Sequence, residues 1–145
     1  MEEFRHEGFV VDRKRVDAQP YVGAGAEVTF DELDGFIAAT LADLGAEKGD
    51  PFFVLYHEAL APGERALVEV CRPSAAQDAT GELPAGEVVY TTARGDQSEF
   101  PRIAHAYDAL TLWAQDHGRE VASPAREAYA ADGSLEISKP LREPD

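Results

Sequence analysis

Two stretches of the chain carry apolar residues at three- and four-residue steps, and this spacing predicts two amphipathic helices. The first spans residues 30–44, with Thr29 and Glu32 forming a capping-box pattern before it and Gly45 ending it. Its stripe consists of Leu33, Phe36, Ile37, Thr40, Leu41 and Leu44. The second begins near Ser98 or Glu99 and ends near Gly118. Its stripe consists of Ile103, Ala106, Tyr107, Leu110, Trp113 and Ala114.

Alternating or continuous apolar runs elsewhere predict β-strands. The expected strands are residues 9–19, 21–28, 51–58, 65–72, 87–95, 124–129 and 135–141, with a tight turn at Asp132-Gly133 before the last one. Residues 74–86 are rich in small and turn-forming residues and are expected to be a connecting loop, whereas residues 1–8 are expected to be frayed. Strands interleaved with two helices in this order predict an α+β fold.

The two halves of the chain repeat each other. Gly45, Pro51 and Tyr56 recur as Gly118, Pro124 and Tyr129 at one constant offset (118 − 45, 124 − 51 and 129 − 56 each give 73). This register predicts a tandem βαββ repeat with pseudo-twofold symmetry, in which an antiparallel sheet and two main helices share one core. Residues 1–145 then form a single domain, with one repeat over about 8–73, a linker over about 74–86 and a second repeat over about 87–141.

One position breaks the repeat in a chemically important way. At the same offset, Val54 of the first half corresponds to Glu127 of the second. Pockets often form where two such units meet, so a central ligand cleft is expected there. A carboxylate that the fold does not need at this position indicates that Glu127 serves a ligand.

Composition and charge exclude several classes of partner. The formal net charge is −15, which is the wrong sign for direct binding to nucleic acid. No apolar run approaches the length of a membrane span, and the N-terminus lacks the features of a signal peptide, so a cytoplasmic location is expected. The single cysteine, Cys71, lies in a strand-like run and is predicted to be a buried structural thiol.

Several stretches together resemble the GyrI-like, or AraC-type effector-binding, superfamily of bacterial small-molecule-binding domains. They are DAQPYVGAG after Val16, the strand PFFVLYHE, the helix segment YDALTLW, Gly118 and the strand REAY. The resemblance covers roughly residues 8–141. It implies the tandem βαββ fold with a ligand cleft between the repeats.

The resemblance also implies a role for one residue. Multidrug-sensing members bind lipophilic cations through a glutamate that aromatic rings surround, and Glu127 in REAY matches it. Other members resemble gyrase inhibitors, and one branch resembles hydrolases of strained electrophiles that use a Glu/Tyr pair. This chain departs from the regulators because it shows no helix-turn-helix and no basic patch, and its turn GDQSEF lacks the Gly-Pro-Tyr type of sequence common in the family.

Glu127 has two interpretations: a strand carboxylate that faces water or pairs with an arginine, or a buried acid with aromatic walls. Tyr129 lies two positions further along the strand and shares its face. Tyr56 is its counterpart in the first half, and Trp113 and Tyr90 complete the expected ligand-binding set, while Tyr107 is assigned to the core. For each of these aromatic residues a purely structural role remains the alternative.

No metal site or other cofactor is expected, because the four histidines do not cluster in sequence. Three functions remain open. The first is a stand-alone protein that binds hydrophobic, cationic small molecules through Glu127. The second is a hydrolase in which Glu127 and Tyr129 act on an electrophilic substrate. The third is an inhibitor whose acidic surface binds a basic protein partner.

Overall fold

The computed structural model describes residues 3–47, 49–58, 62–99, 101–130 and 132–142. The elements follow in this order: β1 (Phe4–His6), β2 (Phe9–Val16), β3 (Gln19–Thr29), α1 (Leu33–Asp43), β4 (Phe52–Tyr56), β5 (Arg65–Pro73), β6 (Gly81–Leu83), β7 (Gly86–Ala93), α2 (Arg102–Asp116), β8 (Ala125–Tyr129) and β9 (Leu135–Pro140). Short 3-10 turns at Phe30–Glu32, Ala76–Asp78 and Gly95–Ser98 complete the elements that are described.

One antiparallel sheet organises the molecule. Its described strands follow the order β1-β2-β7-β9-β8-β4-β5-β3-β6. The six central strands are arranged symmetrically about the pair β8 and β4. One βαββ unit supplies β7, β9 and β8, and the other supplies β3, β5 and β4. Each unit therefore contributes its first, third and second strand, counted from the outside toward the centre. The predicted α+β fold with a tandem repeat is confirmed by this order, in which β4 and β8 form the seam between the units.

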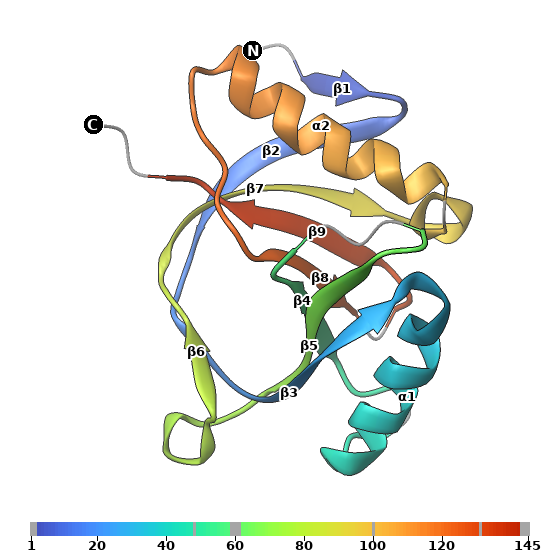
Figure 1. The fold of residues 1–145 in the computed structure, drawn as a ribbon. Coiled ribbons are helices and arrows are strands. Elements are labelled where there is room, and N and C mark those ends of the chain that lie inside the picture. The colour runs from blue at the N-terminus through green and yellow to red at the C-terminus, as the bar shows by residue number, and fades with distance from the viewer. Residues whose placement is uncertain (1–2, 48, 59–61, 100, 131, 143–145) are drawn as a thin grey trace.

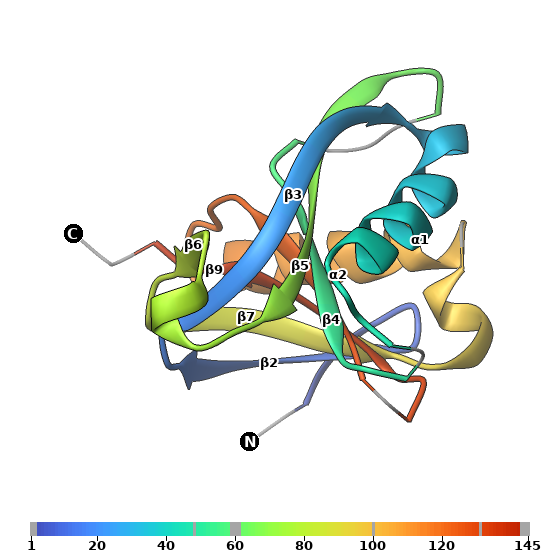
Figure 2. The ribbon, with the colours of Figure 1, turned by 90° about the horizontal axis from the view of Figure 1, so that it is seen from below.

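Both helices pack on the same face of the sheet. Val54 on β4 packs with residues of α1, and Ile137 on β9 packs with residues of α2. Glu127 lies directly between them in the ladder, opposite Val54 on one side and Ile137 on the other, so the three side chains share one face. Figure 1 shows α2 lying across β2 and β7 and α1 lying beside β3 and β5, and Figure 2 shows the second arrangement from below.

The helix boundaries follow from local chemistry. Thr29 and Glu32 form the predicted capping box, in which the Thr29 hydroxyl accepts from the Glu32 amide and the Glu32 carboxylate accepts from the Thr29 amide. The first turn after it is 3-10, so α1 itself begins at Leu33. Gly45 and Gly118 follow the two helices with positive φ of 74° and 65°, the conformation that ends a helix and favours glycine.

Two terminal or connecting segments are more ordered than the sequence predicted. Residues 4–6, expected to be frayed, form β1 and pair with β2. Residues 81–83, expected to be loop, form β6 and pair with the start of β3. Both strands are only three residues long and add to the outer edges of the sheet, where short strands limit unwanted edge pairing.

The strand β2 lies beside β7 of the second unit, so the first stretch of the chain crosses the molecule before the first βαββ unit starts at β3. Cys71 on β5 is fully buried, as the sequence predicted. Within the ranges given above, neither helix is long and apolar enough to cross a membrane.

Candidate functional site

The seam between the two units carries a buried carboxylate. Glu127 on β8 is only 5% exposed, and Val54, its counterpart in the repeat, is its direct partner across the β4–β8 ladder. The pseudo-twofold axis therefore passes between these two residues. Apolar packing at this pair would be enough to hold the two units together, as Val54 shows on its side. The carboxylate of Glu127 therefore breaks the symmetry at a position where the fold does not need a charge.

The same register explains why two tyrosines reach this carboxylate. Tyr56 and Tyr129 lie two positions from Val54 and Glu127 on their strands, so both side chains stand on the helix-bearing face. The Tyr129 hydroxyl donates to Glu127 Oε1 at 3.0 Å, and the Tyr56 hydroxyl donates to the same oxygen at 3.4 Å. The ring of Tyr129 also stacks on Phe52, with centroids 4.6 Å apart.

A third tyrosine comes from the helix above the sheet. Tyr107 on α2 donates a short hydrogen bond to Glu127 Oε2. Tyr107 was expected in the core, and its place on the sheet-facing stripe of α2 is the signal in the sequence that points to this contact. A phenol that points from a helix onto a sheet has to find an acceptor for its hydroxyl. The four side chains Glu127, Tyr56, Tyr107 and Tyr129 are called the carboxylate cluster below.

Burial and hydrogen bonding act in opposite directions on Glu127. Burial raises the pKa of its carboxyl above the usual value, while the hydrogen bonds from the three tyrosines favour the charged form and oppose that rise. The pKa values of all three tyrosines are raised, mainly by their own burial and then by the negative charge of Glu127. No Lys, Arg or His of the described ranges forms an ion pair with Glu127.

The structure places the other predicted aromatic residues elsewhere. Tyr90 on β7 is next to Thr91, which shares the face of Val11 and Ile137, so the ring of Tyr90 points to the opposite face of the sheet. There it lies under the Lys14 ammonium, 4.4 Å from its ring centroid.

Trp113 lies in the core between α2 and the sheet, and its ring stacks on His117 with centroids 3.9 Å apart. No hydrogen bond joins Trp113 to Glu127 in the described part of the chain. From the predicted set, the structure therefore joins Tyr129 and Tyr56 to Glu127 by hydrogen bonds and places Tyr90 on the opposite face. Trp113 belongs to the core cluster against which Tyr129 packs.

The carboxylate cluster is closed in this structure. A hollow of about 310 Å³ lies beside α1 and is lined by Leu41 and Phe52 among others, but not by Glu127. A larger hollow of about 430 Å³ is lined by Arg126, Ala128 and Glu136 of the opposite face and also by Phe52 and Tyr129 at the end of the β4–β8 ladder. The predicted central cleft is thus occupied by tyrosine side chains rather than open.

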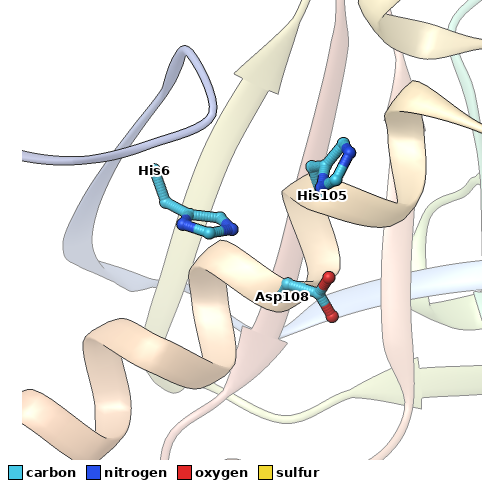
Figure 3. A group of neighbouring side chains, drawn as sticks. All are labelled: His6, His105 and Asp108. Atoms are coloured by element: carbon cyan, nitrogen blue, oxygen red, sulfur yellow. The ribbon is translucent and has the colours of Figure 1, made fainter.

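One group of side chains has the composition of a metal site. His6 on β1 lies against α2, which carries His105 and Asp108, and their donor atoms all lie within 4.8 Å of one another (Figure 3). The expectation of no metal site considered only spacing along the sequence. It missed this group because β1, which brings His6 to α2, was not predicted.

Comparison with known proteins supports the fold. No family model matches the chain, and no curated protein matches it either. Among solved structures, it resembles the C-terminal domain of EcmrR, with a TM-score of 0.68 and 19% identity over 94% of this chain and 99% of that domain. It also matches EcmrR in a complex with DNA, with a TM-score of 0.74 and 18% identity over 94% of this chain but only 58% of that longer one.

Two further solved structures share the fold. An integron cassette protein from the mobile metagenome of Vibrio cholerae matches 94% of this chain and 97% of its own, with a TM-score of 0.53 and 16% identity. A hydrolase from Listeria innocua matches 91% of each chain, with a TM-score of 0.63 and 9% identity. The chain therefore shares the α+β fold of these proteins, as the sequence predicted.

Proposed function

We propose that this protein binds hydrophobic, cationic small molecules, with Glu127 as the charge partner. The observation that carries the proposal is a buried carboxylate that three tyrosine hydroxyls contact and that no cationic side chain of the described residues neutralises. Isolated buried charges are unfavourable, and proteins normally pair them. A ligand cation would supply the missing partner.

The tyrosines suit such a ligand in two ways. Their hydroxyls hold the carboxylate in place before the ligand arrives, and their ring faces attract a cation by about 0.5–2 kcal/mol each in a desolvated site. The aromatic residues proposed to contact the ligand are Tyr56, Tyr129 and Tyr107. Tyr107 takes the place of Tyr90, which lies on the opposite face, and of Trp113, which forms no hydrogen bond with Glu127 among the described residues.

Ligand access requires a side chain of the carboxylate cluster to move, since Glu127 is almost fully covered. Tyr107 belongs to α2, whereas Tyr56 and Tyr129 belong to paired strands at the centre of the sheet. A helix that packs on a sheet can shift without breaking the strand ladder. We therefore assign the opening movement to α2 and its Tyr107, with the central strands as the fixed part of the site.

The test is a titration with tetraphenylphosphonium, followed by calorimetry, alongside its uncharged relative triphenylphosphine oxide. The proposal predicts that the cation binds and that the neutral compound binds at least ten times more weakly. Glu127→Gln should abolish the preference, while the matched control Glu120→Gln, an exposed carboxylate near the start of β8, should keep it. Equal affinity of wild type and Glu127→Gln for the cation would contradict the proposal.

A second function is favoured by one specific observation, the raised pKa of a buried carboxyl that hydrogen-bonds to phenols. In this alternative, ionised Glu127 takes a proton from a water molecule as its oxygen attacks an electrophilic carbon. Tyr129 donates its proton to the leaving atom, and protonated Glu127 then returns a proton to Tyr129 through their hydrogen bond. The net reaction adds water across the cleaved bond.

The two functions separate in one assay. Incubation with styrene oxide, followed by chromatography of the diol product, detects hydrolysis directly. Hydrolysis that Glu127→Gln abolishes while the variant still folds with an unchanged circular dichroism spectrum supports the enzyme. Absence of product together with tetraphenylphosphonium binding supports the binding protein.

A further inference from the structure

A hollow of about 430 Å³ on the face of the sheet opposite Glu127 is lined by more positive than negative side chains, although the chain as a whole is acidic. Lys14, Arg94 and Arg126 line it, and Glu136 is the only acidic side chain that the described residues contribute to the lining. The whole chain has 13 Lys and Arg against 28 Asp and Glu. A lining with three cations and one anion therefore reverses the charge balance of the rest of the molecule.

Arg126 is the decisive residue in this hollow. It neighbours Glu127 on β8 and so points to the other side of the sheet, where its guanidinium lies 4.7 Å from the centroid of the Phe53 ring. Its Nε is buried without a hydrogen-bond partner, and within the described residues the side chain forms no ion pair. Guanidinium groups in such places normally meet a carboxylate or phosphate through paired hydrogen bonds.

The acid in the lining is already engaged elsewhere. Glu136 Oε2 accepts a hydrogen bond from Lys14 Nζ at 2.9 Å, and no ion pair joins Glu136 to Arg126 among the described residues. Burial lowers the pKa of Arg126, and the negative charge of Glu136 opposes that shift without overcoming it. Pro51, Phe52 and Pro73 add apolar surface to the lining, whereas the Phe53 ring is only 1% exposed beneath Arg126.

We propose that this hollow binds a small organic anion, with an oxyanion group on Arg126 and a flat apolar body against Pro51, Phe52 and Pro73. The volume lies within the range of roughly 300–1,000 Å³ that small-molecule sites occupy. Arg94, exposed at the rim, supplies the second positive charge. The protein then has two sites of opposite charge preference on the two faces of one sheet, joined by the neighbouring residues Arg126 and Glu127.

The probe is 2-naphthoate, measured by calorimetry beside 2-naphthamide and inorganic phosphate. The proposal predicts binding of the naphthoate, at least tenfold weaker binding of the uncharged amide, and weaker binding of phosphate, which lacks the apolar body. Arg126→Gln should weaken naphthoate binding by about ten- to a hundredfold, since a charge-assisted hydrogen bond is lost. The matched control is Arg13→Gln, since Arg13 lies on β2 and pairs with Glu87. This substitution should leave naphthoate binding unchanged.

Two controls keep the result interpretable. Arg94→Gln changes an exposed side chain and should also weaken naphthoate binding, so the proposal remains testable if Arg126→Gln fails to fold. Glu127→Gln should leave naphthoate binding intact, which separates this site from the proposed cation site. Equal binding of naphthoate and naphthamide, or undiminished binding by both arginine variants, would overturn the proposal.

A second, independent inference concerns His6, His105 and Asp108. We infer that these three side chains bind a divalent transition metal ion. Two imidazoles and one carboxylate are donors that suit Zn²⁺, and His105 and Asp108 lie three positions apart, on one face of α2. Because His6 belongs to β1, the ion would join the edge strand to the helix (Figure 3).

The test uses Co²⁺ absorption and the Zn²⁺ dependence of the melting temperature. Wild type should show the visible bands of Co²⁺ with protein ligands, Zn²⁺ should displace them, and saturating Zn²⁺ should raise the Tm by several degrees. His105→Gln should weaken binding at least tenfold, and Asp108→Asn should also weaken it. His57→Gln, which alters a histidine paired with Glu69 on another strand, should have no effect. Equal metal binding by wild type and His105→Gln would overturn the assignment.

Discussion

The hydrogen bond from Tyr107 to Glu127 provides a quantitative test of the carboxylate cluster. Oε1 of Glu127 receives two tyrosine hydroxyls, whereas the only described donor to Oε2 is Tyr107. Tyr107→Phe removes a hydroxyl and keeps the ring, so it leaves a buried carboxylate oxygen without a donor and creates almost no cavity. A hydrogen bond to a charged group stabilises a fold by about 1.5–3 kcal/mol, and one between neutral groups by about 0.5–1.5 kcal/mol.

The loss should therefore depend on pH. The bond from Tyr107 favours ionised Glu127, so its removal raises the carboxyl pKa further and is most destabilising where Glu127 is charged. We expect a loss of about 1.5–3 kcal/mol at pH 8 and about 1 kcal/mol at pH 4. At roughly 4 °C per kcal/mol for a chain of this size, the Tm at pH 8 should fall by about 6–12 °C.

The assay is thermal and urea unfolding followed by circular dichroism at both pH values. Tyr90→Phe is the matched control, because Tyr90 lies on the opposite face and its hydroxyl forms no hydrogen bond with the described residues. The Glu127→Gln background should greatly reduce the effect of Tyr107→Phe. If Tyr107→Phe and Tyr90→Phe were equally mild at pH 8, the reasoning about a buried, hydrogen-bonded carboxylate would be refuted.

Three further predictions follow from the same geometry. Because burial raises the pKa of Glu127, its protonation stabilises the fold at low pH, and this contribution is lost as the pH rises through the folded-state pKa. The Tm of wild type relative to that of Glu127→Gln should therefore fall from pH 4 to pH 8. A Tm difference that stays constant over this range would contradict the prediction. Val54→Glu places a second buried carboxylate opposite the first and should destabilise by about 3 kcal/mol or more in urea unfolding, whereas Val54→Ile should be nearly neutral. Gly81→Ala would bring a Cβ to 2.6 Å from the Tyr21 ring and should lower the stability of the fold by about 1–3 kcal/mol. Gly86→Ala is the control, because no atom lies within 4 Å of the added Cβ, and it should leave the stability unchanged. Equal Tm values for the two variants would contradict this packing.

The sequence revealed the repeat but not the way in which its two copies meet. The constant offset of Tyr56 and Tyr129 predicted that they are equivalent, and the βαββ order followed from the helix and strand patterns. The pairing of β4 with β8 is a long-range contact that no local pattern specifies. Only that register shows that both tyrosines reach the same carboxylate oxygen.

Tyr90 shows why the face of a strand is hard to predict. Along β7, one face carries Val89, Thr91 and Ala93 and the other carries Val88, Tyr90 and Thr92, so both alternating sets look partly apolar. Alternation along the sequence predicted the strand. It did not show which of the two alternating groups of side chains faces the helices. The pairing of Thr91 with Val11 and Ile137 decides it.

The place of Glu127 on the pseudo-twofold axis has a consequence for how such a site can arise. A homodimer of a single βαββ unit would bring two copies of the same residue together where Val54 and Glu127 now pair. Two glutamates in that buried pair could not both be ionised, because like charges at such distances strongly disfavour the doubly charged state. Covalent joining of the two units lets their sequences differ, so one unit can place a lone carboxylate on the axis while the other places valine there. The site thereby holds a single carboxylate in place of the coupled pair that two identical units would bring together.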